Sequence, residues 1–567
     1  MMPGAGQATL TQADRLKAYY SDLETGRFTV IADFEQTRQM ELFRSVSRGG
    51  TALHRLSLSS GVPATGGRCL HAAFGQPEDE LIADGSEARQ WHLPRDWREY
   101  DLLMMSVHTP APVDLRLSVA SGEGKLRSIA DSSIPLQAGW NLLRLDLADA
   151  MEHVALDDIR ELRWSLPEIS RPTLLLIDDV ILANNQIDLF GDSRTENGRL
   201  YLRRRGRRWD IGAGGRFELG LTNGQIRYWY DVAEDRLRVR NLVEGTVLGP
   251  TVVSLTGGED FAVPVVESFP VWGDRVVTRQ RLLEASPTRM VVACQWDFVP
   301  PREAATTDLP RQQWTYTIYP TGEVYVHLEC STETQGWAAG NLGLAVSRRD
   351  SDPLNLLCHS TAQLGDTGRL LHVPYAFAGH DRPGGPDLLF VVHDGRSAPL
   401  MKCFREGTLP RVTAVAFGGQ THKPTQEWDC LLSLGLSDTE IGPAGASRAL
   451  YYCFPPTLTP TVGSLVTESE GDRDHDGFNE RFGCYMLAPQ DRRVLLTLDG
   501  KSAPLYNPAF LVQGSTGMES WVYVDYVVLH EVSRTAAGEV VFQIPGLVDT
   551  RRTVEVYLRN PGEQGRR

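Results

Sequence analysis

Hydrophobic and polar residues alternate in short runs along most of this 567-residue chain. Residues 115–119, 323–328, 494–498 and 553–558 show the two-residue period of β-strands, and Gly, Pro, Asn and Asp separate such runs. Helical periodicity is clear only in residues 10–25, where Thr11 can cap a helix. The pattern predicts an almost all-β protein built from sandwiches, with a short helix at its start.

Three turn signals predict hairpins or tight turns in the middle of the chain. Asn197-Gly198 and Asn223-Gly224 favour type I′ turns, because both central residues of that turn need a positive φ. The run 314–319, the turn 319–323 and the run 324–326 together predict an antiparallel strand pair.

The length exceeds what one core supports, so we expect several domains. The predicted organisation is an N-terminal helix at 1–27, a β domain at 28–185, a large β-sandwich at 186–460 and a C-terminal β region at 461–567. This last region is either a separate small sandwich or the last sheet of the large one.

Composition and charge exclude some functions. A net charge of -15 argues against a nucleic-acid partner, which would require a basic face. The sequence has no stretch long enough to span a membrane. The N-terminus has no basic region followed by an apolar one, so either the protein is cytoplasmic or a signal has been removed; we expect an extracellular or periplasmic location. The eight cysteines are scattered and fit no zinc site, although Cys430 and Cys453 could pair in an oxidising compartment.

Residues 472–480 (Asp-Arg-Asp-His-Asp-Gly-Phe-Asn-Glu) have the ligand spacing of a Ca²⁺ loop. Gly477 permits the sharp turn that such loops need, and position twelve is Gly483, so the match to an EF-hand is incomplete. The residues after the loop favour a strand, and the segment is similar to the helix-free loops of dockerin or thrombospondin-type repeats. A solvated acidic turn is the alternative. The predicted ligands are Asp472, Asp474, Asp476, the Phe478 carbonyl and Glu480.

Four short motifs appear in order in the first β domain: Asp33-Phe34-Glu35, Tyr100-Asp101, Gly139-Trp140 and Ile177-Asp178. Their order resembles the galactose-binding-like jelly roll of many carbohydrate-binding modules. In that family the first glutamate and the last aspartate commonly hold a structural calcium ion. The resemblance therefore implies a second Ca²⁺ site at Glu35 and Asp178, against the alternative of two ordinary strand-end carboxylates.

The strand rhythm of residues 186–460, with segments such as 228–231, is similar to the galactose-mutarotase-like supersandwich. That fold occurs in sugar epimerases and as a domain of polysaccharide lyases and glycosidases. The resemblance implies a sugar-related role for the central region and supplies no catalytic motif.

Several segments of the central region collect side chains that could act on a sugar. We name two sets: possible substrate-binding residues, which are Arg205, Tyr228, Tyr230 and Trp428, and possible catalytic residues, which are Tyr375, His380, Arg382 and His422. For each motif a structural role is the alternative: a solvated charge run, a polar surface loop or a core tryptophan.

The resulting hypothesis is a carbohydrate-active protein that binds a polysaccharide or oligosaccharide. If it is an enzyme, β-elimination by a lyase or glycoside hydrolysis are the reactions to test first. The alternative is a non-catalytic, calcium-stabilised cell-surface or assembly protein.

Overall fold

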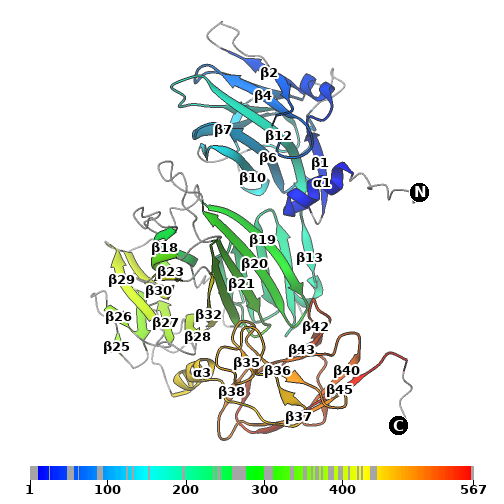
Figure 1. The fold of residues 1–567 in the computed structure, drawn as a ribbon, viewed down its shortest axis with the longest axis vertical. Coiled ribbons are helices and arrows are strands. Elements are labelled where there is room, and N and C mark those ends of the chain that lie inside the picture. The colour runs from blue at the N-terminus through cyan, green and yellow to red at the C-terminus, as the bar shows by residue number, and fades with distance from the viewer. Residues whose placement is uncertain are drawn as a thin grey trace, which may run out of the picture. The chain divides into compact units, whose positions relative to one another are not determined.

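The chain folds almost entirely into β-strands in a computed structural model (Figure 1), which confirms the all-β prediction. The structure describes residues 11–23, 26–47, 56–61, 63–85, 93–122, 125–129, 133–150, 154–194, 198–233, 236–238, 243, 246–257, 276–298, 311–332, 337–348, 354–358, 362–363, 369–371, 375–380, 388–393, 400–406, 409–417, 421–422, 425–434 and 443–562. It forms two compact units. The first comprises Met1–Ile187 with Arg204–Arg208, and the second comprises Asp188–Arg203 with Trp209–Arg567.

The first unit begins with the predicted helix, α1 (Gln12–Tyr19), followed by the 3-10 turn η1 (Ser21–Leu23). Thr11 caps the helix, because its side chain accepts the backbone N–H of Asp14. Buried side chains of this segment pack on one face of a sheet, and together the cluster consists of Leu16, Tyr20, Leu23, Leu102, Met104, Ile181 and Ala183.

Two antiparallel sheets enclose the core of the first unit. One has the order β10 (Gly139–Asp146), β6 (Leu102–Thr109), β12 (Thr173–Asn184), β4 (Cys69–Phe74) and β3 (Ser57–Ser59), with β1 (Arg27–Ala32) also on β12. The other has the order β2 (Phe43–Val46), β5 (Glu80–Asp84), β11 (Ile159–Ser165), β7 (Val113–Ser121) and β8 (Lys125–Ser128), with β9 (Ile134–Leu136) also on β7. Short helical segments lie at η2 (Thr37–Leu42) and α2 (Leu147–Ala150).

The second unit contains two large antiparallel sheets. The first has the order β13 (Ile187–Leu189), β14 (Leu200–Arg205), β15 (Arg208–Ala213), β16 (Phe217–Thr222), β17 (Gln225–Asp231), β18 (Thr246–Gly257), β23 (Trp337–Arg348), β30 (Leu409–Phe417), β29 (Leu400–Glu406) and β26 (Arg369–Leu371), with β31 (Thr421–His422) on β23. The second has the order β19 (Val276–Ala285), β20 (Met290–Phe298), β21 (Arg311–Ile318), β22 (Val324–Ser331), β32 (Thr425–Leu434), β28 (Leu388–His393), β27 (Tyr375–His380), β24 (Leu354–Cys358) and β25 (Ala362–Gln363). Their likeness to the galactose-mutarotase-like supersandwich stays a prediction.

Two of the three turn predictions are confirmed, and Asn197 of the third lies outside the described residues. Asn223 and Gly224 have φ values of 51° and 75°, as a type I′ turn requires. The Gly224 carbonyl accepts the hydroxyl of buried Tyr316 at 2.5 Å, so this turn packs on the second large sheet. Strands β21 and β22 pair antiparallel through the turn at Gly322.

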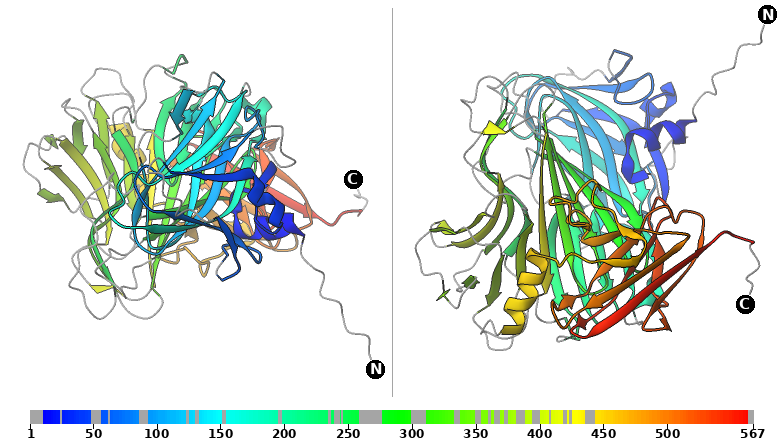
Figure 2. Two further views of the ribbon diagram at one scale, coloured as in Figure 1. Left: turned by 90° about the horizontal axis from the view of Figure 1, so that it is seen from above. Right: turned by 60° about the horizontal axis from the view of Figure 1, so that its bottom comes forward.

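The C-terminal part of the second unit has sheets of its own, visible together in Figure 2. One has the order β33 (Pro460–Val462), β37 (Arg493–Asp499), β45 (Arg551–Arg559), β40 (Glu519–Val524) and β41 (Val527–Val528). The other has the order β34 (Ser464–Leu465), β36 (Cys484–Ala488), β39 (Ala509–Val512), β43 (Val540–Gln543) and β42 (Val532–Arg534), with β35 (Phe478–Asn479) on β36. The remaining elements are η3 (Gly191–Arg194), α3 (Pro443–Cys453), β38 (Leu505–Tyr506) and β44 (Leu547–Val548).

This C-terminal region shares a hydrophobic core with the sheet that contains β22 and β32. Tyr325 and Leu431 of that sheet cluster with Phe478, Tyr485 and Phe510. Gly483 permits the close approach, because a Cβ there would lie 2.2 Å from the Tyr325 ring. The region is therefore joined to the large sandwich, although its sheets are separate.

Two further sequence inferences concern membranes and thiols. Among the described residues, no helix has the length and apolar character needed to cross a membrane. Cys430 and Cys453 are both free thiols, so the disulfide considered above is not formed in the structure.

Candidate functional site

The acidic loop 472–480 follows β34, contains the short strand β35 and is folded around Asp472. The Asp472 carboxylate accepts the backbone N–H groups of His475 at 2.7 Å and Gly477 at 2.9 Å. Gly477 has a φ of 88°, and a Cβ there would lie 2.8 Å from the Leu465 Cβ. Glycine is therefore required both by the backbone and by the neighbouring strand.

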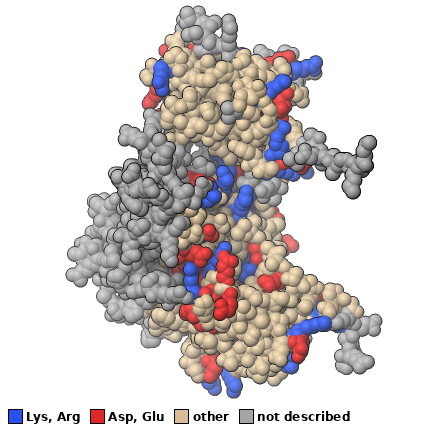
Figure 3. All heavy atoms as spheres, viewed as in Figure 1, with Lys and Arg blue, Asp and Glu red and all other residues tan. Residues whose placement is uncertain are grey.

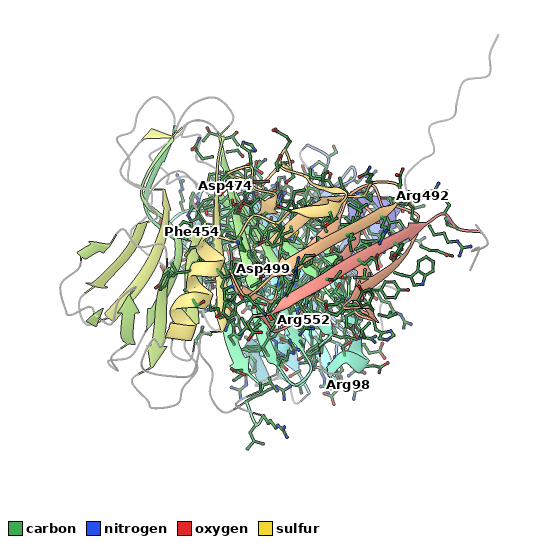
Figure 4. All side chains as sticks on the ribbon, turned by 90° about the horizontal axis from the view of Figure 1, so that it is seen from below. Arg98, Phe454, Asp474, Arg492, Asp499 and Arg552 are labelled. Atoms are coloured by element: carbon green, nitrogen blue, oxygen red, sulfur yellow. The ribbon has the colours of Figure 1, made fainter. Side chains whose placement is uncertain are left out.

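Three of the predicted calcium ligands converge in this loop. Carboxylate oxygens of Asp472, Asp474 and Asp476 all lie within 4.8 Å of one another. Ca²⁺ binds oxygens at about 2.3–2.6 Å, so ligands on opposite sides of one ion lie about 5 Å apart. The three carboxylates fit this spacing. Asp474 is exposed and is labelled in Figure 4, and Figure 3 shows acidic side chains gathered where Figure 1 places β35.

The negative charges of the aspartates in the acidic loop repel one another. Burial, and then the nearby carboxylates, raise the pKa of Asp476 to about 6. Burial raises the pKa of Glu480 to about 8, and the charges of Asp474 and Asp429 act in the same direction. Glu480 accepts the backbone N–H of Arg473 at 2.9 Å and is not part of the group of three. The Phe478 ring is buried against Tyr485, and a ligand role for its carbonyl stays a prediction.

Arg473 fixes the loop to strand β32, a role that the sequence analysis missed. Its guanidinium contacts Asp429 at 2.5 Å and Glu427 at 3.3 Å. Asp429 is fully buried and also lies 2.8 Å from Nδ1 of His327. Burial alone would raise the pKa of Asp429, but the hydrogen bond to His327 and the charge of Arg473 lower it. Two features of the sequence could have indicated this anchor. Arg473 stands between Asp472 and Asp474, and Glu427 and Asp429 alternate along β32.

The second predicted calcium site lies in the first unit, and its two carboxylates engage the segment 64–68. Asp178 Oδ2 accepts the N–H groups of Ala64 at 3.0 Å and Thr65 at 3.2 Å. Glu35 accepts the N–H groups of Gly67 at 2.6 Å and Arg68 at 3.2 Å. Both carboxylates therefore clamp one loop, and the calcium ion implied by the resemblance stays a prediction.

Asp178 is followed by a second buried carboxylate. Asp179 has a φ of 53° at a bulge in β12 and accepts the Tyr20 hydroxyl at 2.6 Å. Burial is the main cause that raises the pKa of Asp178 to about 8 and that of Asp179 to about 6. For Asp178 the neighbouring negative charge adds to the rise.

Tyr228 and Tyr230 lie together on the face of β17 opposite buried Trp229, as strand alternation predicts. Both rings are half-buried, and their centroids are 5.2 Å apart. The Tyr228 ring packs against Gly220, where a Cβ would come within 2.2 Å of the ring. The small residue on β16 thus sets the position of this ring.

Charged pairs border these two tyrosines. The Tyr228 hydroxyl donates to Asp210 at 2.6 Å, and Arg203 binds the other oxygen of the same carboxylate at 2.7 Å. Glu218, opposite Tyr230 in register, accepts the Tyr201 hydroxyl at 2.7 Å and pairs with Arg238 at 3.0 Å. We refer to this surface as the tyrosine face. Its half-buried or exposed residues are Arg203, Glu218, Tyr228, Tyr230 and Arg238, and they are held by buried Tyr201 and Asp210.

The structure does not add the other predicted sugar-binding residues to the tyrosine face. Trp428 is 4% exposed, because β32 lies in the middle of its sheet, and so it is a core residue and cannot stack on a sugar. Arg205 pairs with Asp101 at 3.0 Å within the first unit. Arg203, two residues earlier, is the arginine that reaches the tyrosine face.

The predicted catalytic set is only partly described. Tyr375 is 2% exposed within the shared C-terminal core, and burial raises its pKa, so it is not placed to move protons at a surface. His380 and His422 lie on β27 and β31, but their side chains fall outside the described residues, as does all of Arg382. A role for these three in catalysis stays a prediction.

Comparison with known proteins gives matches in solved structures alone. No protein-family model and no curated protein matches the chain. A family 11 carbohydrate-binding module of a cellulosomal cellulase of Clostridium thermocellum is 14% identical and covers 28% of this chain and 96% of its own, with a TM-score of 0.22. An exo-β-agarase is 15% identical over 27% of this chain, with a TM-score of 0.22. A CBM4 structure is 14% identical over 25%, with a TM-score of 0.18.

These similar structures are carbohydrate-binding modules and agarases. The match spans about a quarter of the agarase chains, at 25% and 24% of their lengths. At this level of identity and TM-score the matches do not establish an activity for this chain.

Proposed function

We propose that this chain binds a polysaccharide and that the tyrosine face is the surface that contacts it. The observation that supports this proposal is the pair of half-buried rings of Tyr228 and Tyr230, bordered by arginine–carboxylate pairs. Aromatic rings offer a flat apolar surface for the C–H face of a pyranose. The exposed guanidinium groups of Arg203 and Arg238 offer strong hydrogen-bond donors for the sugar hydroxyls, and partly exposed Glu218 offers an acceptor.

The tyrosine face is built to be rigid. Tyr228 is held by Gly220 beneath it and by Asp210 at its hydroxyl. Tyrosine also has few rotatable bonds, so fixing its ring against a ligand costs little conformational entropy. A rigid platform therefore suits repeated binding of a stiff glycan chain.

A neutral glycan fits this face better than an acidic one. Arg203 pairs with Asp210, and Arg238 pairs with Glu218. Since each of these arginines already contacts a carboxylate, a uronate or sulfate would have to displace it. Hydroxyl groups can instead bind to Arg203, whose partner Asp210 is buried, and to both members of the Arg238–Glu218 pair.

We propose in addition that the acidic loop binds Ca²⁺ through Asp472, Asp474 and Asp476. Their convergence within 4.8 Å and the raised pKa of Asp476 support a cation there, because a divalent ion would remove the mutual repulsion. The ion would have a structural role, since Arg473 ties the loop to β32.

Affinity electrophoresis in gels that contain mixed-linkage β-glucan, xylan, agarose or a uronate polymer tests the binding proposal. We expect Tyr228→Ala and Tyr230→Ala each to weaken the retarding interaction about tenfold, or about 1.4 kcal/mol. Tyr228→Phe keeps the ring and should retain most of the affinity. Tyr19→Ala removes an exposed tyrosine of α1 and serves as the control. Wild-type mobility of Tyr228→Ala in every retarding gel would refute the proposal.

Catalysis is a separate question that product analysis of the same polysaccharides addresses. β-Elimination would give unsaturated products that absorb in the ultraviolet, and hydrolysis would give new reducing ends. If no polysaccharide is bound or cleaved, the alternative of a calcium-stabilised assembly protein gains support.

A further inference from the structure

A second aromatic surface lies on the C-terminal sheet that contains β37, β45 and β40. Trp521 and Tyr557 are direct partners in the register of β40 and β45, and they are 37% and 38% exposed. Tyr523 lies two residues further along β40, with its ring 6.0 Å from that of Tyr557. We refer to Trp521, Tyr523 and Tyr557 as the aromatic strip. In Figure 4 the strands of this sheet run between the labels of Arg492 and of Asp499 and Arg552.

The alternation of these strands explains why the aromatic strip faces outward. Val522, Val556 and Val494 point to the opposite face, where they belong to the shared C-terminal core. Single exposed hydrophobic residues are normal on protein surfaces, but here three aromatic rings are contiguous on one sheet face. This concentration requires an explanation beyond strand propensity.

Polar groups within the strip identify the kind of ligand. Arg493 forms an ion pair with Glu555 and lies over the Tyr557 ring at 5.2 Å. The Tyr557 hydroxyl donates to Glu555 at 2.6 Å. Burying this group against a dry protein surface would remove the solvation of both charges, which is costly. A ligand rich in hydroxyl groups could bind to the rings and still satisfy the charges.

A hollow of about 270 Å³ adjoins the strip at Trp521. Val528, His530 and Ser533 also line it. Arg534 lines it as well, but its guanidinium already donates to the carbonyls of Ser515 and Gly538. The volume of the hollow is slightly below the roughly 300 Å³ at which small-molecule pockets usually start. The hollow therefore has room for a ligand no larger than about one sugar ring.

We propose that the aromatic strip is a second glycan-binding surface, which stacks a pyranose ring of a neutral polysaccharide on Trp521 beside Tyr557 and takes one sugar unit into the adjoining hollow. The ligand is neutral because the charges here are matched: Arg493 pairs with Glu555, and Glu519 lies opposite Arg559 in register. The inference shares its ligand class with the proposed function, but it does not require the tyrosine face.

The test uses the full chain in affinity electrophoresis with mixed-linkage β-glucan, xylan and agarose. We expect Trp521→Ala and Tyr557→Ala each to weaken retardation at least fivefold, with Trp521→Phe intermediate. Val527→Ala, a change of a 69% exposed residue on the neighbouring edge strand, is the matched control. Equal mobility of Trp521→Ala and the wild type in every retarding gel would overturn the inference.

Combination with Tyr228→Ala separates this inference from the proposed function. If both surfaces bind, the double variant should lose more affinity than either single variant, because two linked sites reinforce each other. If Trp521→Ala alone abolishes binding and Tyr228→Ala has no effect, the aromatic strip stands and the tyrosine face fails. If Tyr228→Ala alone abolishes binding and Trp521→Ala has no effect, the inference about the aromatic strip is overturned.

A measurement on the wild-type chain guards against a variant that does not fold. Polysaccharide should protect the Trp521 indole from mild oxidation, as mapped by peptide mass spectrometry, and unchanged oxidation would refute the inference. The size of the chain in solution should also be measured by light scattering. A wild-type dimer that Trp521→Ala converts to monomers would assign the strip to a second copy of the chain instead.

Discussion

The molecule contains two groups of carboxylates that were both predicted to bind calcium, and their surroundings differ. In the acidic loop, oxygens of Asp472, Asp474 and Asp476 lie within 4.8 Å of one another, although Asp472 also accepts two backbone N–H groups. In the first unit, Asp178 and Glu35 direct their oxygens at separate backbone N–H groups of one loop. The comparison teaches that the same residue type can gather around one point or hold different parts of a loop, and that backbone donors alone do not distinguish the two cases.

The largest effect is expected from the arginine that anchors the acidic loop. Arg473→Leu removes the cationic partner of Asp429, which is 0% exposed. Loss of one partner of a buried ion pair costs about 3–5 kcal/mol, so the second unit should melt well below the wild type. The measurement is a thermal melt with peptide-resolved hydrogen exchange of β32.

Glu470→Gln is the matched control for Arg473→Leu. It breaks the pair with Arg481, in which the Glu470 side chain is 80% exposed. Such surface pairs contribute about 0–1 kcal/mol. Similar melting of the two variants would show that Arg473 does not anchor the loop.

The pH dependence of the first unit should be the next largest effect. The pKa of Asp178 is about 8 and that of Asp179 is about 6, both above the usual 3.8. Between pH 3.8 and these raised pKa values, the folded state therefore binds more protons than the unfolded state. Stability therefore falls as pH rises from 5 to 7, by at most about 4 kcal/mol, and is greatest at the acidic end of that range.

Hydrogen exchange of β12 in the presence of a chelator, at pH 5 and pH 7, measures this pH dependence. If added Ca²⁺ made the first unit more stable at pH 7 than at pH 5, the first unit would also bind an ion, and the contrast with the acidic loop would no longer hold. A bound ion requires ionised carboxylates, so it would make the first unit more stable as pH rises.

Replacement of Asp178 by alanine should have a somewhat smaller effect. The change leaves the N–H groups of Ala64, Thr65 and Asp179 without this acceptor. Unsatisfied buried donors cost about 1–3 kcal/mol, and we expect a loss of about 2 kcal/mol in the melting of the first unit. Asp96→Ala, in an exposed pair with Arg98, is the control and should change stability little. Equal effects of the two variants would contradict a clamping role for Asp178.

The sequence was sufficient for the architecture and for local turns. Strand alternation predicted the all-β fold, helical periodicity predicted α1, and the Asn223-Gly224 pair predicted a type I′ turn, because all three depend on neighbouring residues. It also placed Tyr228 and Tyr230 on one face. Burial of Trp428 could not be read from the chain, because it depends on the central position of β32, which is set by pairing with strands about 40 and 100 residues away.

Long-range pairing also hid the most informative contacts of the site. Arg473 meets Asp429 across 44 residues, and Asp429 meets His327 across 102. Asp210 joins Tyr228 to Arg203 through adjacent strands, and here the sequence named Arg205 where Arg203 makes the contact. Alternation limits which arginines share a face of the strand. It does not tell that Arg205 is the last residue of β14 and that Arg203 lies within the strand.

The smallest effect on intrinsic stability, and the sharpest test of the comparison, is expected for Asp474→Asn. Asp474 is exposed and lies beside two other carboxylates, so its neutralisation in a chelator should change stability by less than about 0.5 kcal/mol. With Ca²⁺ at a hundredfold excess over its dissociation constant, the wild type should gain about 2.7 kcal/mol, and the variant should lose most of this gain. Calorimetric melts with and without Ca²⁺ measure both quantities. A wild-type melt that Ca²⁺ does not raise would mean that the acidic loop holds itself together without an ion.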